Sequence, residues 1–215
     1  MKNSLYLAAG AAALFVCTAA YADDYTPSKA GSWIVDLRGT GVLPANTDAI
    51  KTAAGADTGL KTHISDSYVP TLGITYFITD HISTELVLGT SHHKIKAVGP
   101  GVDLEVRDAW VLPPILTVQY RPAPASRLNP YLGAGLNYMW FYAGSGKNGF
   151  SVKVPNGVGY AVQGGADIAL KGPWTLNVDV KKVFFETDAK VNGGALYSHV
   201  HLDPIVASVG IGRKF

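Results

Sequence analysis

Apolar and polar residues alternate with a period of two in eight separate segments of this chain. Successive side chains of a β-strand point to opposite faces of the sheet, so this alternation predicts strands with one apolar face. In residues 68–79, for example, Leu72, Ile74 and Tyr76 alternate with Gly73 and Thr75. The eight segments are residues 33–42, 68–79, 82–90, 110–121, 130–142, 158–170, 174–180 and 205–215.

The polar faces of these segments carry mainly Gly, Thr, Ser, Gln and Asn, with few charged residues. A soluble sandwich would turn Lys and Glu toward bulk water, whereas the narrow interior of a small barrel requires small polar side chains. Aromatic residues mark the ends of the segments, as in the two aromatic girdles of a membrane barrel. These residues are Trp33, Tyr68, Tyr76, Trp110, Tyr120, Tyr138, Trp140, Tyr142, Tyr160 and Trp174.

The first 22 residues have the form of a secretory signal peptide: Lys2, an apolar stretch from residue 5 to 18, and Ala-Tyr-Ala at 20–22. We expect cleavage after Ala22, which leaves residues 23–215 as one barrel domain. The single cysteine, Cys17, belongs to the removed segment, so we expect no disulfide. The chain is 47% hydrophobic and 16% charged, yet beyond residue 22 no apolar run reaches the roughly 20 residues of a transmembrane helix. A closed barrel facing lipid satisfies both observations.

The connections between the segments are sorted by length. Residues 79–81, 122–128 and 171–173 are short, whereas residues 44–65, 92–107, 143–157 and 188–199 are long and rich in Gly, Asn, Asp, Lys and His. Outer-membrane barrels have short periplasmic turns and long extracellular loops. The sequence therefore predicts an all-β, eight-stranded antiparallel transmembrane β-barrel in the outer membrane of a Gram-negative bacterium.

Several motifs resemble the OmpW family of eight-stranded outer-membrane proteins. The most specific are Leu-Pro-Pro-Ile-Leu-Thr-Val-Gln-Tyr at 112–120 and Asn-Val-Asp-Val-Lys-Lys-Val at 177–183; others lie at 38–44, 70–80, 84–86, 129–138 and 202–204. The resemblance implies passive passage of small hydrophobic molecules. They would enter an apolar pocket open to the outside, meet a polar obstruction below it, and leave sideways through the barrel wall.

Two consecutive prolines lie inside the fourth segment. Proline has no N–H to donate to a sheet ladder and belongs at edges or bulges, although a closed barrel has no edge. We therefore predict a lateral gate at Leu112, Pro113, Pro114 and Ile115, with Pro70 in another strand as a further missing donor. The alternative is a bulge that sets the curvature of the barrel.

Charged residues recur at inward positions of the segments, where a low-dielectric interior requires them to be paired. We predict a polar plug formed by Asp36, Arg38, Glu85, Arg121, Asp167, Asp179 and Lys181. Eight strands enclose an interior just filled by side chains, which disfavours a wide aqueous pore. For the apolar pocket at the mouth we predict Leu60, Ile64, Val69, Met139, Phe141, Phe150 and Phe184.

Other classes of site are not supported by the sequence. The net charge of +2 gives no electrostatic argument for nucleic acid. His92-His93 and His199-X-His201 lack the cysteine or carboxylate spacing of a metal site, so we expect solvated loop histidines, no metal and no cofactor. No phosphate loop or nucleophile elbow is present, and we expect no catalytic residues. The expected partners are small hydrophobic solutes and outer-membrane lipid. The alternative function is an interaction barrel whose loops bind other molecules, bacteriocins or phage.

Overall fold

The computed structural model describes residues 25–45 and 48–215, so the predicted signal peptide, residues 1–22, lies outside the described part. The described chain is almost entirely β-structure, with a single short 3-10 helix, η1 (Asn192–Gly194). The strands are β1 (Trp33–Leu43), β2 (Ala49–Thr52), β3 (Asp57–Ile64), β4 (Ser67–Phe77), β5 (Ile82–Gly89), β6 (Ser91–Gly99), β7 (Val102–Leu112), β8 (Ile115–Tyr120), β9 (Leu128–Ala143), β10 (Val152–Lys153), β11 (Gly157–Ala169), β12 (Trp174–Phe184), β13 (Glu186–Val191), β14 (Leu196–His201) and β15 (Ile205–Lys214).

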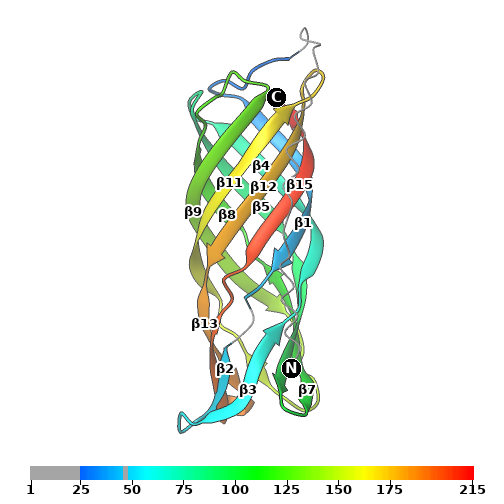
Figure 1. Cartoon of the computed structure of the whole chain (residues 1–215), viewed down its shortest axis with the longest axis vertical. Helices are drawn as coiled ribbons and strands as arrows, with labels where there is room; N and C mark the ends of the chain where they lie inside the picture. Colours follow the sequence, from blue (N-terminus) through cyan, green and yellow to red (C-terminus); the bar gives the residue numbers. More distant parts are fainter. Residues whose placement is uncertain (1–24, 46–47) are drawn as a thin grey trace, which may run out of the picture.

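Eight of these strands form a closed antiparallel barrel in the order β1, β4, β5, β8, β9, β11, β12, β15 and back to β1 (Figure 1). Closure is made by β1, which pairs with β4 along one edge and with β15 along the other. Every strand of the ring therefore has two partners, which satisfies the backbone groups that lipid could not. The predicted eight-stranded barrel is confirmed.

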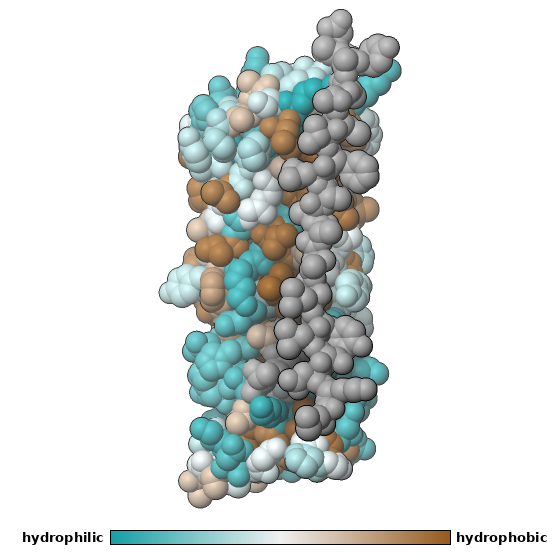
Figure 2. Space-filling model, in the orientation of Figure 1, coloured by the Kyte–Doolittle hydropathy of each residue, from teal (hydrophilic) through white to brown (hydrophobic). Residues whose placement is uncertain are grey.

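The outer face of the barrel is apolar. Leu132, Val158 and Leu37 expose 71%, 64% and 65% of their surface, values that would be costly in water over a whole belt. Apolar side chains gather over the barrel part of the visible face, and hydrophilic ones lie at its two ends (Figure 2). Among the described residues, no helix combines the length and the apolar character that crossing a membrane requires.

Aromatic side chains ring both ends of the apolar belt. At the end with the short turns, the ring of Trp33 lies 4.6 Å from that of Tyr76, and Trp174 is half-exposed nearby in the sheet. At the opposite end, Trp140 and Tyr142 of β9 are exposed, with ring centroids 6.2 Å apart. These positions match the predicted girdles, where amphipathic rings meet the lipid headgroups.

The four long connections are not the irregular loops that we expected. They form seven strands, β2, β3, β6, β7, β10, β13 and β14, which extend the sheet beyond the barrel at the extracellular end (Figure 1). Alternation continues here, with Thr62 and Ile64 buried and Lys61 and His63 exposed. The outer face of this extension carries charged residues because it meets water rather than lipid, and this composition made the segments look like loops.

Candidate functional site: an apolar cavity above an ion-paired plug

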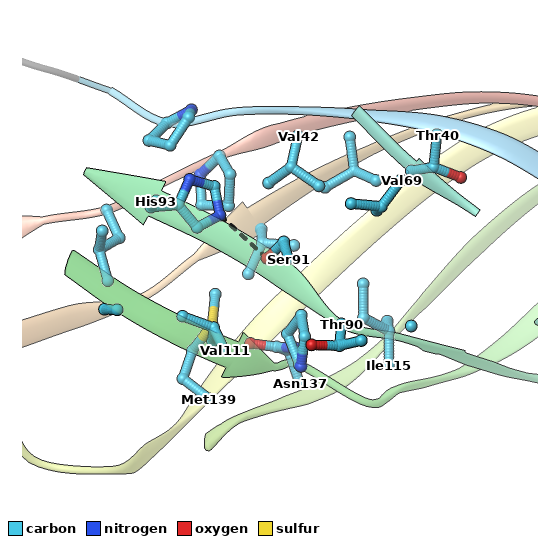
Figure 3. A pocket seen from close by; sticks show the side chains of 18 of the residues that line it. Thr40, Val42, Val69, Thr90, Ser91, His93, Val111, Ile115, Asn137 and Met139 are labelled. Carbon is cyan, nitrogen blue, oxygen red and sulfur yellow. Dashed lines mark hydrogen bonds between the residues drawn. The ribbon is translucent and has the colours of Figure 1, made fainter. Parts of the chain in front are cut away.

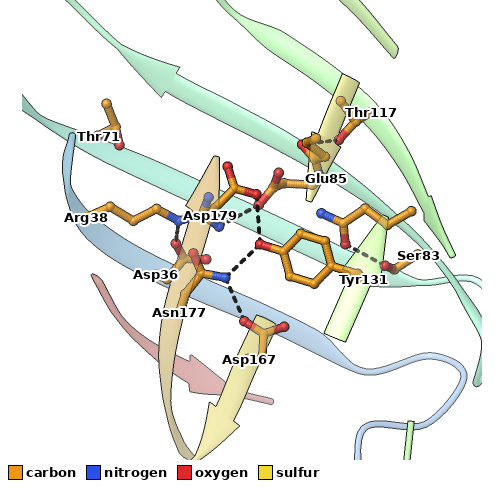
Figure 4. Close-up of polar contacts among 12 residues, drawn as sticks. Asp36, Arg38, Thr71, Ser83, Glu85, Thr117, Tyr131, Asp167, Asn177 and Asp179 are labelled. Carbon is orange, nitrogen blue, oxygen red and sulfur yellow. Dashed lines mark hydrogen bonds and ion pairs between the residues drawn. The ribbon is translucent and has the colours of Figure 1, made fainter. Parts of the chain in front are cut away.

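A network of buried charges fills the barrel interior at its middle (Figure 4). Arg38 of β1 contacts the carboxylates of Asp36 and Glu85. Lys181 of β12 lies 3.0 Å from the second oxygen of Glu85 and 2.5 Å from Asp179. All five side chains are no more than 2% exposed. The inward positions of three strands are thus tied together by charge across the interior.

A second group of side chains continues the network toward the short turns. The guanidinium of Arg121 bonds Asp167 at 2.7 Å and lies between two aromatic rings, with centroid distances of 4.7 Å to Phe77 and 4.6 Å to Tyr131. The hydroxyl of Tyr131 donates to Asp179 at 2.9 Å and accepts from Asn177 at 3.0 Å. Tyr131 thereby joins the two groups, and together they form the plug.

Above the plug the inward side chains change from charged or polar to apolar. The change takes one or two inward positions along each strand, since inward side chains recur at every second residue. It runs from Arg38 to Val42 on β1, from Glu85 to Val87 on β5, from Thr117 to Ile115 on β8, and from Lys181 to Val183 on β12. The plug is therefore the floor of an apolar cavity.

The cavity encloses about 850 Å³ when the open solvent at its mouth is included. Val42, Val69, Val111, Ile115 and Met139 converge on it (Figure 3). A cluster that includes Met139, Val183 and Phe185 forms its wall. A second apolar space continues into the extension, and both are lined by Ile64, Ile95, Phe141 and Leu202.

The polar groups on the cavity wall are largely engaged with one another. The hydroxyls of Thr40 and Thr71 lie 2.7 Å apart. His93 contacts the Ser65 carbonyl through Nδ1 at 2.7 Å and the Ser91 hydroxyl through Nε2 at 2.9 Å. A neutral imidazole that donates from Nδ1 and accepts at Nε2 satisfies both contacts. Burial lowers the pKa of His93, in agreement with a neutral ring. Of the side chains that line the cavity, Asn137 retains a buried Oδ1 atom without a hydrogen-bond partner, and the rest of the wall is mainly apolar.

The barrel wall has a gap in its hydrogen-bond ladder beside this cavity. On one side of the gap β5 pairs with β8 up to Val87 and Ile115, and on the other β6 pairs with β7 from Ser91 and Val111. Both ladders have the same register, yet between them residues 88–90 do not pair with residues 112–114. Gly89, Thr90 and Pro113 line the cavity from the two edges of the gap. The interruption of the ladder therefore lies beside the cavity.

The segment that contains the two prolines is held on its other side. Its pairing with β9 keeps one register from Leu112–Trp140 to Ile115–Asn137. The carbonyl of Pro114 accepts bonds from the Tyr138 amide and the Asn137 side chain, both at 3.1 Å. The ladder is thus interrupted only toward β5 and β6. Pro70 marks a related interruption, because the β4–β5 ladder ends at the next residue, where Thr71 pairs with Gly89.

The structure brings all seven predicted plug residues into one buried network. Of the predicted gate residues, Pro113 and Ile115 line the cavity. Leu112 and Pro114 lie on the opposite parity of the same segment. The prolines separate β7 from β8 rather than lying within one strand.

Four of the predicted pocket residues, Ile64, Val69, Met139 and Phe141, line the cavity. Leu60 and Phe150 pack instead against the apolar cluster of the extension. Phe184 was assigned to the wrong face: it is 46% exposed on the outside, and its neighbour Phe185 occupies the interior. Since β12 runs on to residue 184, its alternation places Phe184 with the outward residues Val178 and Val180.

Sequence reasoning missed some residues of the site. Tyr131 lies at an inward position of β9, but nothing in the sequence pairs it with Asp179. Gly89 lies so close to β4 that a Cβ atom there would be 2.5 Å from the Thr71 methyl. His93 was assigned to a loop. A continuation of alternation through residues 91–99 was the signal that could have placed it on a strand.

The lipid-facing belt, the closed ring of eight strands and the extracellular extension define an outer-membrane β-barrel of a Gram-negative bacterium. The chain belongs to the OmpW family, whose sequence profile matches residues 29–215. This family comprises porin-like barrels of the outer membrane rather than enzymes.

Individual proteins agree with this assignment. An uncharacterized outer-membrane protein, y4mB of Sinorhizobium fredii, is 40% identical over 97% of this chain and 95% of its own length. The crystal structure of the outer membrane protein OprG from Pseudomonas aeruginosa superposes with a TM-score of 0.82 at 29% identity, covering 88% of this chain and 98% of that one. The dibenzothiophene metabolism operon protein PahQ of Pseudomonas aeruginosa is 27% identical over 70% of this chain and 73% of its own length.

Proposed function

We propose that this protein is a channel for the passive uptake of small hydrophobic molecules, which leave sideways through the barrel wall into the membrane. The observation that carries the proposal is the position of the ladder gap at residues 88–90 and 112–114, beside an apolar cavity whose floor is closed by ion pairs. A solute that enters from outside cannot continue along the axis without breaking the plug. The lateral route leads directly to lipid.

The free energies of the lateral and axial routes also favour the lateral route for an apolar solute. An apolar solute gains about 25 cal/mol for each Å² that it removes from water in the cavity, and it keeps that gain when it passes into acyl chains. Passage through the plug would expose the solute to Arg38, Glu85 and Lys181, whose pairing could be broken only at a cost of several kcal/mol. An apolar molecule therefore favours the wall over the axis.

A relative supports the class of solute. PahQ is named for the metabolism of dibenzothiophene, a polycyclic aromatic compound of low polarity. A cavity walled by Val, Ile, Met and Phe side chains fits such a molecule better than a sugar or an ion.

The gate is tested by restoring the missing donors. Replacing Pro113 and Pro114 by Val supplies two backbone N–H groups to the strand, and we expect the uptake of a hydrophobic solute by cells to fall several-fold. The matched control replaces Pro122 and Pro124, which lie in the short turn beyond β8, by Val, and should take up the solute at the original rate. Unchanged uptake in the first variant, at equal amounts of folded barrel, would show that the prolines serve only the curvature of the wall.

The rival function is an interaction barrel whose extracellular part binds other molecules, bacteriocins or phage. The extension supports this rival function, because a folded sheet offers a fixed surface to a partner. An adhesin has no need of an apolar cavity that ends at a wall gap, however. Uptake by a variant with a filled cavity separates the two functions, because only transport depends on that space.

A further inference from the structure

The hairpin of β13 and β14 carries two histidines and two carboxylates side by side on one face. Glu186 pairs with His201 and Asp188 pairs with His199 across the antiparallel ladder. Residues at every second position share a face of a strand, so these four side chains form a compact group. They lie in the extension, outside the barrel strands, and the side chain of His199 is 51% exposed.

The two imidazole rings present the same nitrogen to one carboxylate. Nε2 of His199 lies 3.3 Å from Oε2 of Glu186, and Nε2 of His201 lies 3.6 Å from Oε1 of the same side chain. One ligand atom from each of the three residues can be chosen so that all lie within 4.8 Å of one another. Two imidazole nitrogens and a carboxylate therefore converge on one small region.

The other nitrogen of each ring has its own carboxylate. Nδ1 of His199 lies 2.8 Å from Asp188, and Nδ1 of His201 lies 2.9 Å from Asp48. Asp48 also accepts the backbone N–H of His201 at 2.8 Å. A histidine that binds a metal typically donates its second ring N–H to a carboxylate, which fixes the tautomer and aims the free nitrogen at the ion. Both histidines of this hairpin have that arrangement.

We propose that Glu186, His199 and His201 bind a zinc ion. Ligand atoms at about 2.0–2.1 Å from a tetrahedral zinc ion lie roughly 3.3 Å apart. Each imidazole Nε2 lies at a similar distance, 3.3 or 3.6 Å, from one of the two oxygens of Glu186. Imidazole with carboxylate suits zinc, whereas magnesium and calcium prefer oxygen ligands alone. The three side chains leave the fourth position of a tetrahedral site to water.

A bound ion would fix the hairpin over the cavity. The opposite face of β13 and β14 carries Thr187 and Val200, which line the apolar space of the extension. Zinc would link β13 to β14 directly, and Asp48 would link β14 to the chain between β1 and β2. The sequence alone indicated no metal, because Glu186 lies far along the chain from His199 and only the strand pairing brings it there.

The test is zinc binding to the full-length barrel, refolded in detergent micelles without a polyhistidine tag and first treated with EDTA. Calorimetric titration with zinc chloride should show about one ion per chain. Replacing both His199 and His201 by Ala should weaken that binding more than about 100-fold, beyond the 10–100-fold loss that is typical of outer-shell changes. Asp188→Asn should fall within that outer-shell range. Cobalt substituted for zinc should give the absorption of a tetrahedral site.

The matched control removes two other histidines, His63 and His92, from the extension and should bind zinc as the original protein does. Circular dichroism checks that each variant keeps its β-structure, as we expect from the exposure of the changed side chains. Absence of zinc binding, equal binding after loss of His199 and His201, or binding of magnesium with the same affinity would each overturn the proposal.

Discussion

The plug and the cavity are built by the same strands, from inward side chains two to four residues apart, yet they have opposite properties. In the plug, four carboxylates and three cations are buried and linked in pairs. In the cavity above it, valine, isoleucine and methionine leave an open space. The barrel interior is therefore open at the extracellular end and closed by the plug, rather than open at both ends. The inward side chains distinguish the two levels: they are ion-paired in the plug and apolar in the cavity.

The wall shows a matching difference. At the level of the plug, β5 and β8 pair continuously from Ile82–Tyr120 to Val87–Ile115. At the level of the cavity, the ladder is interrupted for residues 88–90 and 112–114 before it resumes at Ser91–Val111. The wall is continuous where the interior is closed, and interrupted where the interior is open. This correspondence is what a lateral exit requires.

The largest expected effect comes from breaking the plug. Glu85→Ala leaves Arg38 and Lys181 without a shared partner, and loss of one member of a buried pair costs about 3–5 kcal/mol. Urea unfolding of the barrel in lipid vesicles measures this free energy. Glu105→Ala is the control, since Glu105 lies 4.0 Å from a largely exposed Lys94 and its removal should cost less than about 1 kcal/mol. Equal losses in the two variants would mean that the plug contributes no more than a surface pair.

Filling the cavity should block the path of the solute and leave the plug intact. Ala109 is 1% exposed and lines the cavity, so Ala109→Phe places a ring in the open space. We expect hydrophobic uptake to fall to the level of cells without the protein, at an unfolding free energy changed by less than about 3 kcal/mol. Val178→Phe, on the lipid-facing side, is the control. Uptake that survives in the first variant would place the solute path elsewhere.

The smallest effect concerns His93, the one titratable side chain among the described residues that line the cavity. Burial lowers the pKa of His93, so the folded protein holds this ring neutral where the unfolded chain, with a pKa of about 6.5, already binds a proton. The unfolded state then binds more protons, and stability falls as the pH drops below about 6.5. A titration of the His93 ring by NMR checks the sign: a midpoint above the ordinary value would contradict a buried neutral imidazole.

Much of this architecture can be predicted from the sequence. Period-two alternation located the eight barrel strands. Inward parity and charge together indicated the seven plug residues, because charges buried in a barrel interior must be paired. The Pro113–Pro114 pair pointed to the interrupted ladder, since missing N–H groups are a local property of the chain.

The features that could not be predicted from the sequence depend on contacts between residues that lie far apart along the chain. The extension was read as loops because its outer face is hydrophilic, although Thr62 and Ile64 show the same alternation as the barrel. Phe184 was assigned inward because the end of β12 was placed four residues too early. Tyr131 and Glu186 act through partners that only the strand register supplies.

The central claim is that the plug closes the interior and that solutes leave through the wall above it. Its most direct test is the uptake of a panel of solutes, graded from hydrophilic to hydrophobic, by cells with and without the protein. The account predicts that the protein accelerates uptake increasingly with hydrophobicity and leaves sugars and ions at their background rates. Equal rates across the whole panel, or faster entry of the hydrophilic solutes, would contradict it.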